Sequence, residues 1–264
     1  MTTPLSTNSA VPVRHWPIAL LLGALGGLGA ALVVPYVLAL NPPTTPLPLP
    51  MWAIVLSSAL QNGVIVGALG ALALKLAYPL GLDAPLLRRW LRCGPSPEIR
   101  FGDAGLAVGL GVLATAIVIA ADIAFAPYMP KFDLKHGGPS AIVGLMASFY
   151  GGITEELMLR LIVMGLTAVA LARLTRRRLT PTIAWIAIAF AALLFGIGHL
   201  PAAAQLAPLD AVFVTRTLVL NGGVGMICGW LFWRRGLEMA IVAHFSADIV
   251  LHVLMPLLNS LASR

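Results

Sequence analysis

Ionisable side chains that lie within long apolar runs are the residues of this sequence best placed to do chemistry. They fall in clusters on three runs, in the order Glu155, Glu156 and Arg160, then His199, then His244 and Asp248. An ionised side chain near the centre of a membrane helix costs roughly 2.5 to 3.5 kcal/mol on insertion scales. Side chains retained at that cost are usually paired with one another, face a water-filled cavity, or serve a function.

Helical spacing separates the two adjacent acids. Neighbours on an α-helix point about 100° apart, whereas residues four apart share a face. Glu156 and Arg160 are four apart, so they can form a salt bridge that braces the bundle. Glu155 lies off that face and has no obvious local partner. A carboxylate in a water-accessible apolar pocket is suited to act as a general base on water.

The histidines complete a set of groups that could act together. His244 and Asp248 are four apart, so the carboxylate could orient the imidazole, or both could bind a metal. A single histidine in an apolar run would be as readily a packing or hydrogen-bonding residue, but two histidines and two acids on three runs favour an active site. Phe195 lies one turn before His199 on the same face, and we expect it to pack rather than react.

These clusters must be positioned by a membrane-embedded bundle of helices. The chain has 264 residues, of which 59% are hydrophobic and 10% charged, and its mean hydropathy is +0.93. Sheet edges cannot be satisfied in lipid, so we predict an all-α polytopic membrane bundle of seven to eight transmembrane helices. A break at Gly222-Gly223 would give the eighth helix. The seven apolar segments lie near residues 17–40, 51–74, 103–127, 140–172, 181–201, 208–233 and 236–258.

The charge pattern predicts an orientation and excludes nucleic acid as a partner. The net charge is +7, but the basic residues lie in short loops and form no stripe with interleaved aromatics. They gather in alternate loops, which the positive-inside rule places in the cytoplasm: Arg14, Arg88, Arg89, Arg92, Arg100, Arg173, Arg176, Arg177, Arg178, Arg234 and Arg235. We therefore predict a multi-pass protein with a cytoplasmic N-terminus and the lipid bilayer as partner. Low Lys content with Ala, Gly and Arg richness favours a bacterial inner membrane.

The two cysteines and one arginine within an apolar run have simpler explanations than catalysis. Cys93 and Cys228 lie in a basic loop and an apolar run, which implies neither a disulfide framework nor a thiolate metal site. Arg216 lies in the sixth run with no acid three or four residues away. For Arg216 we expect a salt bridge to an acid on another helix, or a position at the outer interface, in preference to a substrate contact.

The three clusters, in this order on consecutive apolar runs, resemble the CPBP intramembrane protease family, also known as the type II CAAX prenyl endopeptidase or Abi family. The pattern of that family is a double Glu with Arg four residues after the second, then Phe with His four residues later, then His with Asn or Asp four residues later. The matching residues here are Glu155, Glu156, Arg160, Phe195, His199, His244 and Asp248. The resemblance covers about residues 140–258.

The resemblance implies an all-helical membrane core that cleaves peptide bonds in a cavity open to water. Glu155 with His199 would activate water, and His244 with Asp248 would stabilise the oxyanion or hold a metal, while Glu156 and Arg160 would support the site. Many members have Asn where this chain has Asp248, and an ionised Asp cannot donate to an oxyanion. The implied division of the chain is residues 1–16 as an N-terminal cytoplasmic tail, 17–138 as N-terminal membrane helices, 139–258 as the catalytic core and 259–264 as a C-terminal tail.

The resemblance leaves the cofactor and the substrate open. A divalent metal such as zinc could bind Glu155, His199, His244 and Asp248, because two histidines and a carboxylate suit a catalytic zinc. The His-Glu-x-x-His motif of soluble zinc proteases is absent, and a glutamate-activated water needs no metal, so we favour the metal-free mechanism. The expected substrate is a membrane-associated protein or peptide, either a prenylated CAAX protein or a membrane protein, signal peptide or secreted peptide.

Two other classes of function fit some of the same residues. A proton-coupled transporter would also place Glu, Arg, His and Asp along its pathway, although the sequence shows no inverted repeat. A non-catalytic immunity or scaffold protein of the membrane would use its loops to bind a partner. Peptide cleavage that depends on Glu155 separates the protease from both alternatives.

Overall fold

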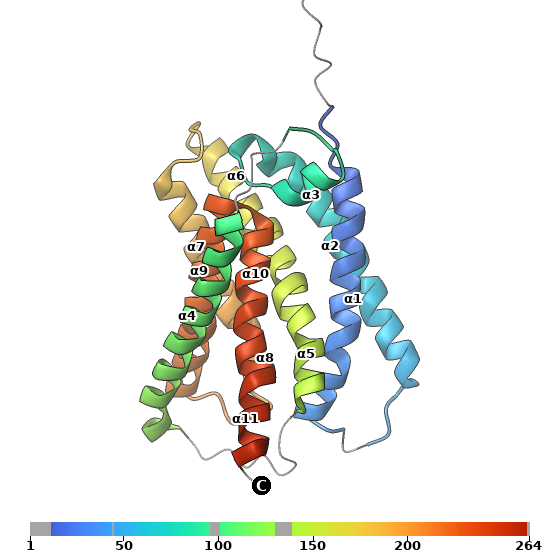
Figure 1. Cartoon of the computed structure of the whole chain (residues 1–264), viewed down its shortest axis with the longest axis vertical. Coiled ribbons are helices and arrows are strands. Elements are labelled where there is room, and N and C mark those ends of the chain that lie inside the picture. Colours follow the sequence, from blue (N-terminus) through green and yellow to red (C-terminus); the bar gives the residue numbers. More distant parts are fainter. Residues whose placement is uncertain (1–11, 44, 96–100, 130–138, 263–264) are drawn as a thin grey trace, which may run out of the picture.

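The computed structural model describes residues 12–43, 45–95, 101–129 and 139–262, and within these ranges every regular element is a helix. Seven helical stretches in this part of the chain are long and apolar enough to cross a membrane (Figure 1). They are Trp16–Leu40, Met51–Leu80, Phe101–Tyr128, Ala141–Leu174, Pro181–Ala203, Ala211–Arg235 and Leu237–Leu261. The predicted all-α polytopic bundle is confirmed, with seven candidate spans.

Individual elements follow the predicted segments closely. The N-terminal half contains α1 (Trp16–Leu40), α2 (Met51–Ala77), η1 (Tyr78–Leu80), α3 (Pro85–Trp90), α4 (Phe101–Phe125) and η2 (Ala126–Tyr128). The C-terminal half contains α5 (Ala141–Phe149), η3 (Tyr150–Glu155), η4 (Leu157–Met164), α6 (Gly165–Leu174), α7 (Pro181–Gly198), α8 (Leu200–Ala203), α9 (Ala211–Arg235), α10 (Leu237–Asp248), η5 (Ile249–Leu254) and α11 (Met255–Ala262).

Local sequence signals explain where these helices begin. Thr180 caps α7 by accepting a hydrogen bond from Ile183 N, and Asp210 caps α9 by accepting one from Phe213 N. The chain turns between α1 and α2 through the proline-rich residues 41–50. The glycine pair in the sixth run does not interrupt α9, which is continuous from Ala211 to Arg235. The alternative of eight spans through a break there is therefore wrong.

The fourth and seventh spans change from α-helix to wide π-helical turns in their middle. In the fourth, η3 and η4 follow α5; η3 ends at Glu155, η4 contains Arg160, and Glu156 lies between the two. In the seventh, η5 follows directly after Asp248. π-helical turns with i→i+5 hydrogen bonds are rare and occur frequently at functional sites. The two spans pack against each other, with α5 on η5 and η3 on α10, so each π-helical stretch contacts an α-helical part of the other span.

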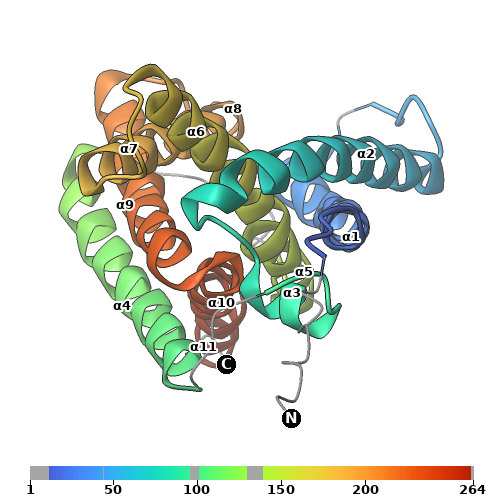
Figure 2. The same cartoon turned by 90° about the horizontal axis from the view of Figure 1, so that it is seen from above.

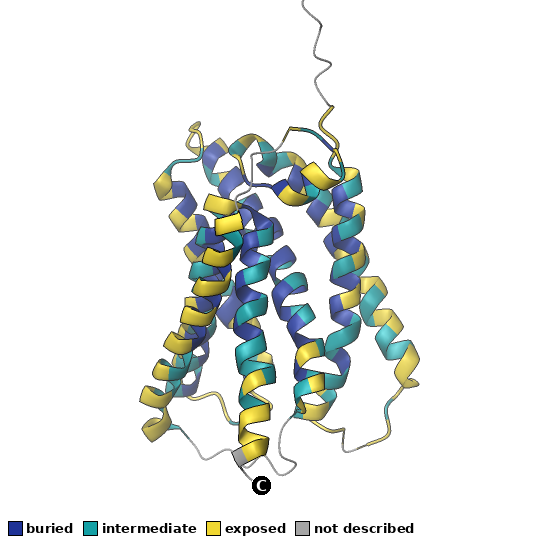
Figure 3. Cartoon of the chain, in the orientation of Figure 1, coloured by how far each residue is buried: buried dark blue, intermediate teal, exposed yellow. Residues whose placement is uncertain are grey.

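Viewed from above, α1 and α2 lie on one side of the bundle and α4, α7 and α9 on the other, with α5 and α10 between them (Figure 2). Glycines bring α1 and α2 together: a Cβ on Gly23 would lie 2.9 Å from Gly63 O, and one on Gly27 would lie 2.6 Å from Ala59 O. Small residues at such positions permit close approach of membrane helices. Buried residues lie mainly toward the inside of the bundle, and exposed residues lie on its outside and at its lower helix ends (Figure 3).

The end of the bundle drawn at the top of Figure 1, where α3 and α6 lie, contains a buried ionic cluster. Arg88, fully buried, donates from Nη2 to Asp83 Oδ1 at 2.7 Å and from Nη1 to the carbonyl oxygens of Arg14 and Cys93. Arg88 therefore holds the N-terminal approach to α1 against α3, rather than contacting lipid headgroups. We call this end, which also carries Arg173, Arg234 and Arg235, the Arg-rich end.

Candidate active site

A cavity of about 590 Å³ opens among α1, the π-helical part of the fourth span, α7, α9 and the seventh span. The four residues expected to do chemistry all line it: Glu155, His199, His244 and Asp248. The lining residues of α1, α7 and α9 belong to the halves of those helices that lie away from the Arg-rich end. The cavity therefore occupies the opposite half of the bundle.

Glu156 and Arg160 lie behind this cavity as a fully buried pair. Arg160 Nη2 is 3.0 Å from Glu156 Oε1, as their spacing predicts, and both side chains are 0% exposed. The same oxygen is 2.8 Å from His244 Nδ1. Glu156 thus orients the His244 imidazole, a role for which the spacing within the seventh run had suggested Asp248. Asp248 lies instead near the other ring nitrogen, with Oδ1 at 3.7 Å from His244 Nε2.

The hydrogen bonds at the Nδ1 atoms determine what His199 and His244 present to the cavity. His199 Nδ1 is 2.9 Å from the Phe195 carbonyl oxygen, and His244 Nδ1 is bound to the Glu156 carboxylate. Both partners are acceptors, so each Nδ1 carries a proton and donates it. A neutral imidazole of either residue then has a bare Nε2. These two nitrogens converge on Glu155, whose oxygens lie 4.0 Å from His199 Nε2 and 3.9 Å from His244 Nε2.

The separations among these groups exceed hydrogen-bond length but suit one shared small molecule. Polar groups more than 3.5 Å apart commonly interact through a bridging water. A water between Glu155 and the bare Nε2 atoms can donate a hydrogen bond to each side. Glu155 is partly accessible, with 17% of its side chain exposed, whereas Glu156 is sealed from solvent. Of the two adjacent acids, Glu155 is the one that water can reach.

Gly151 provides the space in front of the seventh span. A Cβ at this position would collide with Asp248 Oδ2 and lie 3.5 Å from His244 Nε2. The absence of a side chain at Gly151 therefore leaves room beside the two groups. At Gly152 a Cβ would meet Phe245 instead, at 2.7 Å from its Cβ, so this second glycine lets the fourth and seventh spans pack closely.

Phe195 packs against the site, in agreement with its expected role. It is 4% exposed, and its ring meets His199 and His244 edge to face at centroid distances of 4.7 and 5.5 Å. The guanidinium of Arg160 lies 5.2 Å from the centroid of the same ring. Phe195 thereby contacts the guanidinium of Arg160 and both imidazoles and helps to fix the two rings.

Two sets of side chains are candidates for a metal ion. Glu156, Cys228 and His244 have ligand atoms within 4.8 Å of one another. This set does not fit a divalent cation, because Glu156 is already paired with the buried guanidinium of Arg160, which would repel it. The outer set of Glu155, His199, His244 and Asp248 has suitable donors. The distances from His199 to Glu155 and from His244 to Glu155 and Asp248 are 3.7 to 4.0 Å, more than the about 3.3 Å between tetrahedral ligands of zinc, so binding would require contraction.

Other side chains that line the cavity belong to none of the three sequence motifs. Tyr36 from α1 and His252 from η5 line it, and spacing alone gave neither a role, although His252 lies four residues after Asp248. Arg216 also lines the cavity and forms a salt bridge to Asp122 on α4, with Nε to Oδ1 at 2.6 Å. This is the interhelical partner that we expected for Arg216.

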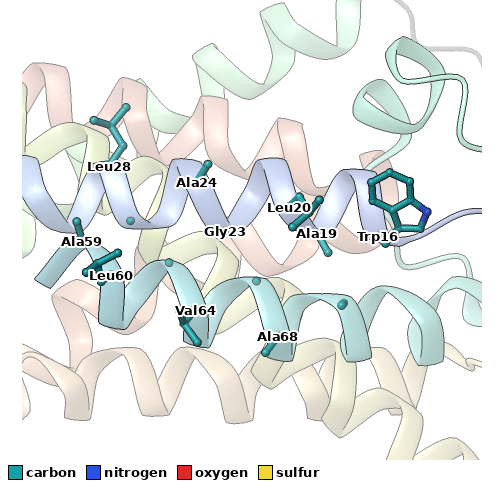
Figure 4. Close-up of a pocket in the computed structure, with 14 residues that line it drawn as sticks. Trp16, Ala19, Leu20, Gly23, Ala24, Leu28, Ala59, Leu60, Val64 and Ala68 are labelled. Carbon is teal, nitrogen blue, oxygen red and sulfur yellow. The ribbon is translucent and has the colours of Figure 1, made fainter. Parts of the chain in front are cut away.

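A second cavity, of about 670 Å³, lies along the contact between α1 and α2 (Figure 4). Its walls are small and apolar side chains such as Ala24, Leu28 and Val64, and no ionisable residue is among those described there. This groove offers a surface for apolar chains but no groups for hydrolysis. The ionisable side chains of the three motifs line the cavity that contains Glu155 instead.

Comparison with known protein families identifies the same segment of the chain. The family described as type II CAAX prenyl endopeptidase Rce1-like matches residues 137–250. No curated protein and no solved structure matches the chain. The matched residues include all three motif clusters, from Glu155 to Asp248, and the family suggested by those motifs is confirmed.

Proposed function

We propose that the chain, whose residues 137–250 match the type II CAAX prenyl endopeptidase family, is a membrane protease that hydrolyses a peptide bond of a membrane-associated protein or peptide with Glu155 as the general base. The observation that supports this assignment is the convergence of two imidazole Nε2 atoms on the accessible carboxylate of Glu155. A water at that point would contact Glu155 as its base and lie beside the imidazoles, which could stabilise the negative charge of the transition state.

In the proposed reaction, Glu155 takes a proton from water as the oxygen attacks the scissile carbonyl. His199 accepts a hydrogen bond from the same water through its bare Nε2 and so helps to orient it. The carbonyl oxygen becomes an oxyanion in a tetrahedral intermediate. Glu155 then returns the proton to the leaving amine, and the peptide bond breaks.

Stabilisation of the oxyanion is assigned to His244. Its Nε2 donates a hydrogen bond only when the ring is protonated, and the carboxylate of Glu156 at Nδ1 favours that imidazolium. Donors aimed at the developing charge are commonly the largest contribution to such catalysis. Arg160 pairs with Glu156 and holds that carboxylate in place from behind. Asp248 lies beside Nε2, with Oδ1 at 3.7 Å.

The donor set is compatible with a divalent metal. We nevertheless propose the metal-free reaction, because the distances between these donors fit it better. If a zinc ion bound, Glu155, His199, His244 and Asp248 would hold it. It would polarise the scissile carbonyl and lower the pKa of bound water.

The position of the cavity bears on the substrate. By the positive-inside rule we place the Arg-rich end and the N-terminus in the cytoplasm, in a bacterial inner membrane. The cavity then opens in the outer half of the bilayer. We therefore propose that the substrate is a membrane protein, signal peptide or secreted peptide reached from that side, in preference to a prenylated protein in the cytoplasm.

The assignment is tested with purified protein in liposomes that contain membrane-anchored peptides. We expect the parent protein to cleave such a peptide and Glu155→Gln to abolish cleavage. The matched control is Asp210→Asn, which changes another acid to its amide and retains the helix cap on α9. Its rate should equal that of the parent. Full activity in Glu155→Gln would refute the assignment of Glu155 as the general base. Ion flux through the parent protein without peptide cleavage would instead support a transporter.

A further inference from the structure

Tyr36 of α1 and His252 of η5 contact each other at the wall of the cavity. The Tyr36 hydroxyl is 3.2 Å from His252 Nδ1, and the two rings meet edge to face at a centroid distance of 5.4 Å. The other nitrogen, His252 Nε2, is 3.8 Å from Asp248 Oδ1. His252 is 35% exposed in its side chain, so the pair faces the cavity rather than the packed core.

The partners of His252 determine where its proton lies. At Nδ1 the partner is a hydroxyl, which can donate, whereas Nδ1 of His199 and of His244 faces an acceptor. At Nε2 the neighbour is a carboxylate, which can only accept when ionised. Both contacts are satisfied by a neutral ring in which Tyr36 donates to Nδ1 and Nε2 carries the hydrogen. In that state His252 offers an N–H group at Nε2 without being charged, whereas neutral His199 and His244 have a bare Nε2.

Asp248 has a need for such a donor. In the proposed reaction the Nε2–H group of His244 donates to the oxyanion, so it does not serve Asp248, whose Oδ1 atom lies 3.7 Å away. An asparagine at this position would carry its own N–H donors, but an aspartate has none. The Nε2–H group of His252 approaches the same Oδ1 atom from the next helical turn. It can hold the carboxylate while His244 donates to the oxyanion.

We propose that Tyr36 and His252 are a positioning pair that fixes the carboxylate of Asp248 for the reaction. Neither residue lies within the matched segment 137–250, so the active site extends to α1 and η5. The proposal rests on the proposed function, because the carboxylate being positioned belongs to that site. It assigns α1 a part in catalysis in addition to its part in the fold.

The kinetic test removes the hydroxyl alone. Tyr36→Phe keeps the ring contact, and we expect its kcat to fall about three- to tenfold with KM unchanged, the range for loss of one neutral hydrogen bond. Tyr128→Phe, at an exposed tyrosine of η2, is the matched control and should equal the parent. His252→Gln retains an N–H group and should be more active than His252→Ala. In an Asp248→Asn background, Tyr36→Phe should have no effect, because the amide supplies its own donors.

Equal losses from Tyr36→Phe in both backgrounds would indicate a purely structural role and overturn the proposal. Nitrogen NMR of ¹⁵N-histidine-labelled protein provides a test that does not require activity, with His252→Gln identifying the resonance. We expect His252 protonated at Nε2 in the parent, and a bare Nε2 would overturn the pair. Activity retained in Glu155→Gln would contradict the proposed function, while the NMR result would still decide the state of His252.

Discussion

Replacing Gly151 by alanine tests the position of the reaction space most directly. The added methyl would collide with Asp248 Oδ2, lie 3.2 Å from Asp248 Cγ and lie 3.5 Å from His244 Nε2. The atom in the way is the end of a side chain, which can rotate into the cavity. We therefore expect the protein to fold with nearly unchanged stability.

Activity should respond differently, since the carboxylate must move by on the order of 1 Å and the methyl takes up the space beside the imidazole. Misplacement of that size can reduce a rate by about 100-fold. The assay compares kcat in liposomes, on the peptide that the parent cleaves, with the thermal unfolding midpoint of the same preparation. Gly151→Ala should lose about two orders of magnitude in kcat and keep its midpoint.

Gly152→Ala is the matched control at the adjacent residue. Its Cβ would lie 2.7 Å from Phe245 Cβ and 3.0 Å from Phe245 Cα, so the backbone of α10 must shift. Overpacking of this kind typically costs about 1 to 3 kcal/mol. We expect a lowered unfolding midpoint in this variant. A folded Gly151→Ala protein with the parent rate would show that the reaction takes place elsewhere and refute the reasoning.

Two further predictions concern the buried pair and the metal. Glu156→Gln leaves the fully buried Arg160 without its counter-charge, so its free energy of unfolding, measured with denaturant, should fall by about 3 to 5 kcal/mol. The free energy of unfolding of Glu155→Gln should fall little, and equal stability of both variants would contradict the bracing role. Elemental analysis of active protein should find less than one zinc per chain, and prolonged chelation should leave kcat unchanged; stoichiometric zinc whose removal abolishes cleavage would establish the metal mechanism.

The bundle could be predicted from the sequence because apolar runs and basic loops report directly on membrane spans. The segments near residues 17–40 and 181–201 agree with α1 and with the span Pro181–Ala203 to within a few residues. The pairing of Glu156 with Arg160 followed from their spacing on one helix. Contacts between helices could not be predicted from the sequence in this way, because the rotation of one helix against another is set by packing.

Three features of the site show this limit. The partner of His244 Nδ1 proved to be Glu156, on another span, rather than the Asp248 available at helical spacing. Tyr36 lies more than 200 positions before His252, and neither residue stands out in an apolar run. Cys228, which suggested no site, lies beside Glu156 and His244 because α9 packs against α10. Each contact depends on the tertiary arrangement and none on a local pattern.

The π-helical turns at the site have a consequence for how the chain tolerates length changes. A turn closed by i→i+5 hydrogen bonds holds one residue more than an α-turn, so it is equivalent to a single inserted residue. Deleting one residue from η3 would restore a regular α-helix and rotate all that precedes it by about 100° relative to Arg160. Gly29 of α1, which abuts Phe149 and Tyr150, would then face a different side of the fourth span. The fourth span would regain α-helical geometry at η3 and lose the alignment of α1 with the groups at the cavity.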